Sequence, residues 1–319
     1  MHRGELLYTI RDILCNAGFY VSHVHSMRPV GFDLVARRDN TLLIIKVLTN
    51  INALSEEVAQ ELKTLSSLLH GNPLLIGIRS GAGILEDDVV YDRFGIQTVT
   101  SDTLQSHLLE GMPLKVYAGP GGFYVNLNNK KLVTLRREKQ ISLGSFARSV
   151  HVSRRTVRLY EDGMNARVDV ACRIEDLLGE PLIKDIEIIH GKTLSHNREA
   201  DATSSSPSIV PPFQKEIFTF LSSLGYEIIP MGRCPFEAVS VEREKILLTC
   251  VHRYDKKLQK KAEIVSSISK ITEQKAVVFT DKKGTQDHIQ GTPLIVREEL
   301  KKINCPEDII DLILERIGS

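Results

Sequence analysis

Apolar spacing in the middle of the chain predicts a short amphipathic helix. Its buried face has the spacing i, i+3, i+4 and i+7 and consists of Leu143, Phe146, Ala147 and Val150. Ser142 directly precedes this face, and serine is a favoured N-cap because its hydroxyl accepts a hydrogen bond from the first turn of a helix. The pattern therefore predicts a helix that begins after Ser142 and packs through one side.

A second helix is predicted after a two-residue interruption at positions 151–152. Ser153 can cap it, and Val157 and Tyr160 share a face that can be buried. Gly163 is a suitable left-handed stop. Two capped helices joined by a tight turn form a helix-turn-helix, and the small Ala147 allows the helices to cross closely.

Two longer stretches on either side of this region resemble each other. The run GFDLVARRDNTLLIIKVL (31–48) aligns without gaps on PFEAVSVEREKILLTCVH (235–252). Around both runs the pattern predicts the same order of helix, hairpin, helix, strand and closing helix. Strands flanked by helices indicate a mixed α/β fold, and the repeated order indicates a duplicated domain.

Composition divides the chain into domains and linkers. Residues 191–210 are polar and rich in Ser, Thr and Pro, which is typical of a flexible linker. Residues 119–131 begin with a Gly- and Pro-rich run and are predicted as a second linker. We therefore expect α/β domains at 1–118 and 211–319, with a helical domain at 132–190 between them.

The overall composition excludes several classes of protein. A chain of 319 residues with 42% hydrophobic and 25% charged residues is globular and too long for one core. No apolar run reaches the roughly 18–20 residues that span a bilayer. The five cysteines are scattered, with no C-x-x-C pair, so we expect neither a disulfide framework nor a zinc site. The sequence indicates a cytoplasmic protein with no resident metal or cofactor.

Positive charge is concentrated around the two predicted helices. The net charge of the chain is +1, yet residues 130–163 contain nine basic and three acidic residues, which gives +6 and leaves −5 for the rest. The basic residues are Lys130, Lys131, Arg136, Arg137, Lys139, Arg148, Arg154, Arg155 and Arg158, and the acidic ones are Glu138, Glu161 and Asp162. A local field of this sign is typical of a surface that binds phosphates.

The segment LRREKQISLGSFARSVHVSRRTVRLYEDG (135–163), with the trailing helix VDVACRIEDLLG (168–179), resembles DNA-binding domains of the Cro and lambda-repressor type. The turn position that is often Gly in that family is His151 here, and histidine adopts the left-handed conformation at modest cost. The resemblance implies that the N-terminal part of the second helix enters the major groove of double-stranded DNA.

The expected DNA-binding residues follow from that placement. Arg154, Arg155 and Arg158 lie opposite the apolar face of the second helix, and the arginine fork matches the O6 and N7 acceptors of guanine. Hydroxyls and helix N-termini contact phosphates, and Thr156 can touch a thymine methyl group. The complete predicted set is Leu143, Ser145, Ser153, Arg154, Arg155, Thr156, Arg158 and Leu159, with Arg136 and Arg137 as further phosphate contacts.

The first repeated run also resembles the restriction-endonuclease and Holliday-junction-resolvase-like fold. That fold places an Asp at the start of one strand and a Lys at the end of the next, as Asp33 and Lys46 stand here. Its second acid, two residues before the Lys, is replaced by Ile44. The aligned positions of the second run are Glu237, Leu248 and Cys250. Because one carboxylate holds a divalent metal poorly, the resemblance implies the nuclease-like fold without catalytic residues.

The order of nuclease-like domain, helix-turn-helix and second nuclease-like domain resembles a family of archaeal helix-turn-helix transcriptional regulators. We therefore expect a sequence-specific, double-stranded DNA-binding regulator that is not an enzyme. Homodimerisation through the α/β domains, with half-sites about 34–36 Å apart, is expected because one helix reads few base pairs. These domains could also hold an effector or a protein partner. Two alternatives remain: a metal-dependent nuclease or resolvase-like enzyme targeted by the helix-turn-helix, and an adaptor whose middle domain binds protein.

Overall fold

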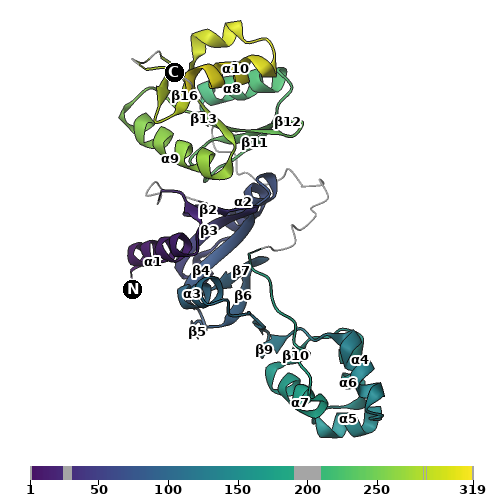
Figure 1. Cartoon of the computed structure of the whole chain (residues 1–319). Helices are drawn as coiled ribbons and strands as arrows, with labels where there is room; N and C mark the ends of the chain where they lie inside the picture. Colours follow the sequence, from purple (N-terminus) through teal and green to yellow (C-terminus); the bar gives the residue numbers. More distant parts are fainter. Residues whose placement is uncertain (1, 24–30, 190–209, 283, 285, 318–319) are drawn as a thin grey trace. The chain divides into compact units, whose positions relative to one another are not determined.

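The structure of the protein is a computed structural model that describes residues 2–23, 31–189, 210–282, 284 and 286–317 (Figure 1). The chain divides into two compact units, and each unit combines stretches that are far apart in the sequence. The first unit comprises Met1–Ala17, Val47–Leu54 and Leu74–Gly191, and the second comprises Gly18–Lys46, Ser55–Pro73 and Lys192–Ser319.

The first unit contains a sheet of mixed direction and two helices that pack together, α1 and α3. Strand β4 pairs in parallel with β7, β7 pairs antiparallel with β6, and β5 lies beside β4. The elements are α1 (Arg3–Asn16), η1 (Ile51–Ala53), β4 (Asn72–Ser80), β5 (Gly83–Ile84), β6 (Val89–Arg93), β7 (Ile96–Val99) and α3 (Ser101–Leu109).

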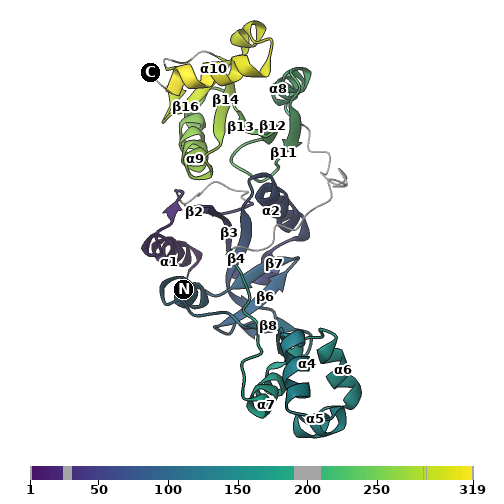
Figure 2. The ribbon, with the colours of Figure 1, turned by 45° about the vertical axis from the view of Figure 1, so that its right-hand side comes forward.

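The same unit continues into what we call the helical body, residues 116–189, whose four helices pack around one apolar core (Figure 2). Its elements are β8 (Val116–Gly119), β9 (Gly122–Val125), α4 (Asn129–Glu138), α5 (Leu143–Ser149), α6 (Arg154–Glu161), β10 (Ala166–Arg167) and α7 (Val168–Leu178). The core includes Phe146, Val157, Tyr160 and Ile174. The predicted helices at 143–150, after Ser153 and at 168–179 are therefore confirmed as α5, α6 and α7.

The expected linker at 119–131 is wrong as a description of the local structure. Strands β8 and β9 form a hairpin, and α4 begins at Asn129, ahead of the expected start of the helical domain at 132. The Gly- and Pro-rich run is the hairpin turn, with Gly121 at φ +80°. Val125 and Leu127 belong to the core of the helical body, so this segment is part of its packing. The linker expected at 191–210 lies, except for its last residue, outside the described residues.

The second unit contains two ladders of strands. One runs β1-β2-β3, and the other is a six-stranded sheet in the order β11-β12-β13-β14-β16-β15. The elements are β1 (Tyr20–Val21), β2 (Leu34–Arg38), β3 (Thr41–Asn50, of which residues 41–46 belong here), α2 (Glu56–Leu68), α8 (Pro212–Ser223), β11 (Glu227–Pro230), β12 (Ala238–Glu242), β13 (Lys245–Val251), α9 (Lys256–Thr272), β14 (Lys275–Thr280), β15 (His288–Ile289), β16 (Thr292–Val296), η2 (Arg297–Lys302) and α10 (Pro306–Ile317).

The two runs that align in sequence form hairpins with the same register. Leu34 pairs with Ile45 in the first hairpin, and Ala238 pairs with Thr249 at the aligned positions of the second. Likewise, β14 is parallel to β16 and β16 antiparallel to β15, as β4, β7 and β6 are in the first unit. The molecule is therefore mixed α/β with two sheets, as the sequence pattern predicts. None of its described helices is both long and apolar enough to cross a membrane.

Candidate nucleic-acid interface

Both short helices of the predicted motif begin at a serine N-cap. The hydroxyl of Ser142 accepts a hydrogen bond from the Ser145 amide at 3.1 Å and starts α5. The hydroxyl of Ser153 accepts one from the Thr156 amide at 3.0 Å and starts α6. These bonds satisfy first-turn amides that have no partner inside the helix, so each cap fixes where its helix starts.

The turn between α5 and α6 uses a left-handed residue. His151 has φ +58°, the conformation expected for the position that is often Gly in the resembled family. The amide of Val152 donates to the carbonyl of Ala147 at 3.0 Å, which closes the end of α5. Val152 also packs against the core of the helical body. The turn therefore holds the two helices at a fixed angle.

The outer face of α6 carries three arginines that pair with no acid among the described residues. Val157 and Tyr160 are buried, whereas Arg154, Arg155 and Arg158 are exposed, as the helical period requires. No ion pair involves these three residues within the described part of the chain. Their guanidinium groups are therefore available to an external anion.

Arg154 lies against the backbone of α5 at Gly144. A Cβ atom added at Gly144 would come within 2.8 Å of Nη2 and 2.9 Å of Nε of Arg154. Real Cβ atoms essentially never come so close to another heavy atom. The absence of a side chain at Gly144 therefore gives the Arg154 guanidinium its place beside the first turn of α5.

Arg136 does not take the phosphate-binding position expected for it. Its Nε is 2.5 Å from Oε1 of Glu161, its Nη1 donates to the Ile141 carbonyl at 2.9 Å, and only 11% of its side chain is exposed. Arg136 therefore ties α4 to the end of α6. The expectation failed because charge spacing along a sequence does not show which acid folds back onto a base. Arg137, its neighbour, is exposed as expected.

The other predicted residues divide into exposed and partly packed side chains. Leu159 is 40% exposed on α6, and Ser153 is exposed at its start. Leu143 packs partly against the apolar core, and Ser145 is half-buried. Thr156 is half-buried, with its hydroxyl 2.8 Å from that of Ser153. The helical body thus brings the predicted set together around α5 and α6, with Arg136 on its inner side.

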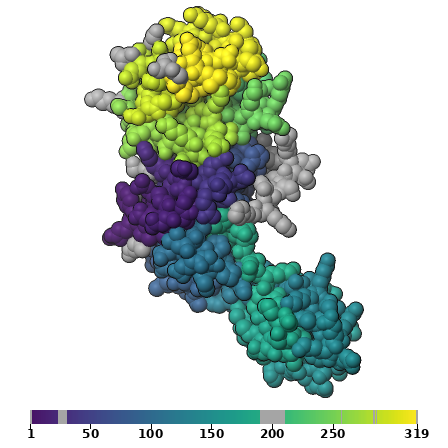
Figure 3. All heavy atoms as spheres, in the orientation of Figure 1, coloured from purple at the N-terminus to yellow at the C-terminus, as the bar shows by residue number. Residues whose placement is uncertain are grey.

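A basic surface remains after the internal ion pairs are removed. Of the nine basic residues at 130–163, Arg136 pairs with Glu161, and Lys131 pairs with Glu180 at 3.1 Å. The seven others are exposed: Lys130, Arg137, Lys139, Arg148, Arg154, Arg155 and Arg158. Lys130, Lys139 and Arg148 were not among the predicted contacts, although the local charge count already included them. In the space-filling view, the helical body is rounded on the face shown (Figure 3).

The nuclease-like positions hold buried ion pairs. Nζ of Lys46 is 3.5 Å from Oδ2 of Asp33, which is fully buried. The place of the second acid is occupied by Ile44, which is also fully buried. The closeness of Asp33 and Lys46 is part of the motif of this fold, and what the site lacks is the second carboxylate, because one carboxylate holds a divalent cation poorly.

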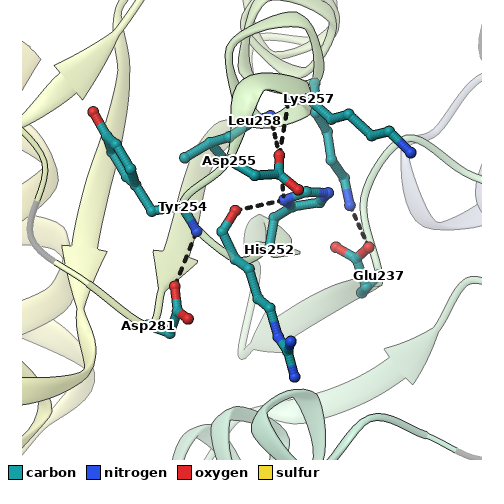
Figure 4. A network of polar contacts seen from close by, with 9 residues as sticks. Glu237, His252, Tyr254, Asp255, Lys257, Leu258 and Asp281 are labelled. Carbon is teal, nitrogen blue, oxygen red and sulfur yellow. Dashed lines mark hydrogen bonds and ion pairs between the residues drawn. The ribbon is translucent and has the colours of Figure 1, made fainter.

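At the aligned positions of the second unit, the lysine comes from a helix. Cys250 stands where Lys46 does in the first run, and Lys261 of α9 pairs with Glu237 instead. Figure 4 shows Glu237 near the start of α9, where Asp255, Lys257 and Leu258 lie. Glu237 also accepts the amide of Val251 at 2.7 Å. Both runs therefore keep a carboxylate with an ammonium partner, and the sequence alignment missed Lys261 because it lies on another element.

Two groups around Glu237 have shifted pKa values. Burial raises the pKa of the Cys250 thiol well above its usual range, so this thiol is protonated and unreactive at neutral pH. Burial lowers the pKa of Lys261, but the charge and hydrogen bond of the Glu237 carboxylate help to outweigh this effect, and the pKa of Lys261 is raised. Among the described residues, no group of three or more His, Cys, Asp or Glu side chains could hold a metal ion.

The chain is similar to known proteins in two ways. A family model described as "PD-(D/E)XK superfamily domain" matches residues 3–114, so the chain contains a restriction-endonuclease-like domain. It is also 38% identical to a protein of Halorubrum lacusprofundi, 36% identical to one of Halobacterium salinarum and 37% identical to one of Methanococcoides burtonii. Each alignment covers 99% of this chain and 98% of the relative, and each relative is named "Putative HTH-type transcriptional regulatory protein". No solved structure matches the chain.

Proposed function

The chain belongs to the family of these archaeal relatives, which carry the name of HTH-type transcriptional regulators, and we propose that it is itself a regulator that binds specific double-stranded DNA sequences. The observation that carries the proposal is the outer face of α6. Three exposed arginines, which form no ion pair within the residues that the structure describes, project from a helix whose opposite face is buried. A helix of this kind fits the major groove, where arginine recognises guanine.

The residues around α6 would have different roles in DNA binding. Arg154, Arg155 and Arg158 would reach base edges and nearby phosphates, and Leu159 would contact a thymine methyl group. The N-terminus of α5, next to Arg154, would approach a phosphate through its amides. A single α6 reads few base pairs, so we expect a homodimer on half-sites about one helical turn apart.

The expected duplication is supported by the backbone. Residues with positive φ recur at equivalent places: before the first strand, in the hairpin turn, at the end of the following helix and in the last turn. These pairs are Gly18 and Gly225, Asp39 and Arg243, His70 and Glu273, and Gly95 and Gly291. Left-handed residues are uncommon outside Gly, so the two non-glycine pairs, Asp39 with Arg243 and His70 with Glu273, favour a common ancestor of the two α/β copies. We propose that these copies support the DNA-binding body and catalyse no reaction.

A nuclease remains the second candidate, because the family model that matches residues 3–114 describes a restriction-endonuclease-like domain. In this chain the fold lacks the second acid and pairs its remaining acid with Lys46. The regulator is favoured because the basic surface is present, whereas the metal ligands are incomplete.

The test begins with selection of bound fragments from genomic DNA, followed by titration of the best fragment at several salt concentrations. In the Arg154→Ala/Arg155→Ala variant, we expect specific binding to be lost and the slope of log K against log salt to become shallower by about 1–2. Lys184→Ala, an exposed lysine outside the basic surface, is the matched control. An unchanged slope in the arginine variant would contradict the proposal.

A further inference from the structure

Within the second unit, stretches that are distant in the sequence lie against each other. Helix α9 packs against β2, and two views show α9 beside β2 and α2 beside β11 (Figures 1 and 2). One side of this contact comes from residues 18–46 and 55–73, which are part of the first α/β copy, and the other comes from residues 211–319, the second copy. The contact therefore joins one copy to the other.

The loop after β11 lies on α2. The amide of Arg233 donates to Glu61 Oε1 at 2.7 Å, and its Nη2 donates to Glu57 Oε2 at 2.8 Å. Nη1 of Arg233 is also 3.8 Å from Glu61 Oε2. Cys234, the next residue, has its sulfur 3.6 Å from Glu61 Oε1. The second copy thus places its loop on two glutamates, one turn apart, on the helix of the first.

The loop after β1 makes the reciprocal contact on α9. The amide of His23 donates to Ser267 Oγ at 3.0 Å, and His23 Nδ1 is 3.8 Å from Glu263 Oε1. Glu263 and Ser267 are again one turn apart on the helix that follows the hairpin. The two loops meet where the Gly31 amide donates to the Arg233 carbonyl at 2.5 Å.

A further bond closes the end of α9. Nη2 of Arg37, on β2, is 2.7 Å from Glu273 Oε2, and Nη1 donates to the Thr272 carbonyl at 3.3 Å. The last carbonyls of a helix carry partial negative charge and no partner inside the helix, so a guanidinium group is a suitable cap.

From these reciprocal contacts we infer that the two α/β copies pair with each other within one chain, as two subunits of a dimer would. The face that carries α2, β2, α9 and the two loops is therefore occupied by the chain itself. A second copy of the protein must associate through a different surface. The inference rests on the proposed duplication but not on DNA binding, so its tests contain no DNA.

The first test measures amide hydrogen exchange in α2 after substitution of Arg233, which lies 172 residues from Glu61 in the sequence. Arg233→Glu places a carboxylate beside Glu57 and Glu61, so exchange in α2 should become about two- to fivefold faster, as loss of a partly exposed ion pair implies. Arg243→Glu is the control, because Arg243 is 84% exposed and pairs with its neighbour Glu242. Equal exchange in the two variants would overturn the inference.

The second test asks whether the pair forms inside one chain. Cysteines replace the half-exposed His23 and Glu263 in a full-length chain whose exposed Cys15 and Cys172 are serines, and a short bis-maleimide is added. We expect a cross-linked product with the mass of one chain, and none with His23→Cys alone. Cross-linked dimers, or no cross-link, would show that the copies do not pair within the chain.

Discussion

Gly144 shows how one residue can set the geometry of the candidate interface. It lies in the first turn of α5 with no side chain, and the Arg154 guanidinium occupies the space that a Cβ would need. Helices are usually more stable with Ala than with Gly, by about 0.8–1.0 kcal/mol. A Cβ at position 144 would move the end of the flexible Arg154 side chain, so Gly144→Ala tests whether Arg154 needs its present place.

We predict that Gly144→Ala lowers DNA affinity without lowering the stability of the fold. The variant should unfold at the same or a higher temperature because alanine favours the helix. Its DNA affinity should fall by about 1 kcal/mol or more, the scale of one arginine contact to a base, because Arg154 is displaced. Thermal unfolding and fluorescence anisotropy measure the two effects.

Gly4→Ala is the matched control for this change. Gly4 lies in the first turn of α1 with no atom within 4 Å of an added Cβ. The control should gain stability without losing affinity. If both alanine variants bind DNA equally well, Arg154 does not need its place beside Gly144.

At the level of elements, the pair Glu237–Lys261 connects β12, β13 and α9. The carboxylate accepts the Val251 amide at the end of β13 and the ammonium group of α9. Side chains of both residues are mostly buried, with 20% and 7% exposed. Removing one partner of such a pair leaves an uncompensated charge, which usually costs about 3–5 kcal/mol.

We therefore predict that Lys261→Met lowers the free energy of unfolding by about 3–5 kcal/mol. Glu237→Leu combined with Lys261→Met should recover part of the loss, because leucine removes the unpaired charge but leaves the buried Val251 amide without its acceptor. Denaturant titration measures both. Because the pKa of Lys261 is raised above 10.5, its contribution is complete below pH 10.5 and is lost as the pH rises further. Lys257→Met, an exposed lysine one turn earlier on α9, should change stability little, and a loss equal to that of Lys261→Met would contradict the assignment.

Elements with a strong local signal could be predicted from the sequence. The apolar period and serine caps fixed α5 and α6, and the ungapped alignment predicted both hairpins. The β8–β9 hairpin was taken for a linker because its Gly-Pro run marks a turn and a loop equally well. Arg136 was misplaced, and Lys261 was missed as the partner of Glu237, for one reason. In both cases the ion pair depends on which oppositely charged residue lies next to the side chain after folding, and the spacing of residues in the sequence does not contain that information.

At the level of the whole molecule, the nuclease-like fold and the basic surface imply different activities. The first copy keeps one acid and neutralises it with Lys46, and the second keeps one acid and neutralises it with Lys261. A metal-dependent nuclease needs several carboxylates to hold its cation and activate water. The single acid at each of the two positions agrees with the proposed structural role of the α/β copies.

We predict no cleavage of supercoiled DNA by the full-length chain with magnesium or manganese, measured by agarose gel electrophoresis. The control is a preparation of Asp33→Ala, which should give the same background of nicked plasmid as the unaltered chain. Cleavage that is present in the unaltered chain and vanishes with Asp33→Ala would establish the enzyme and reject the purely regulatory proposal.

The pairing of β6 with β8 has a mechanical consequence. Val89 and Val90 pair in parallel with Val116 and Tyr117, so the hydrogen-bonded ladder runs from the nuclease-like sheet directly into the hairpin beneath the helices. A flexible glycine-rich linker would let the helical body rotate freely, whereas the β6–β8–β9 ladder joins it to the sheet through backbone hydrogen bonds. If α6 binds DNA as proposed, a ligand that bends or twists the sheet at β6 would change the angle at which α6 meets the duplex.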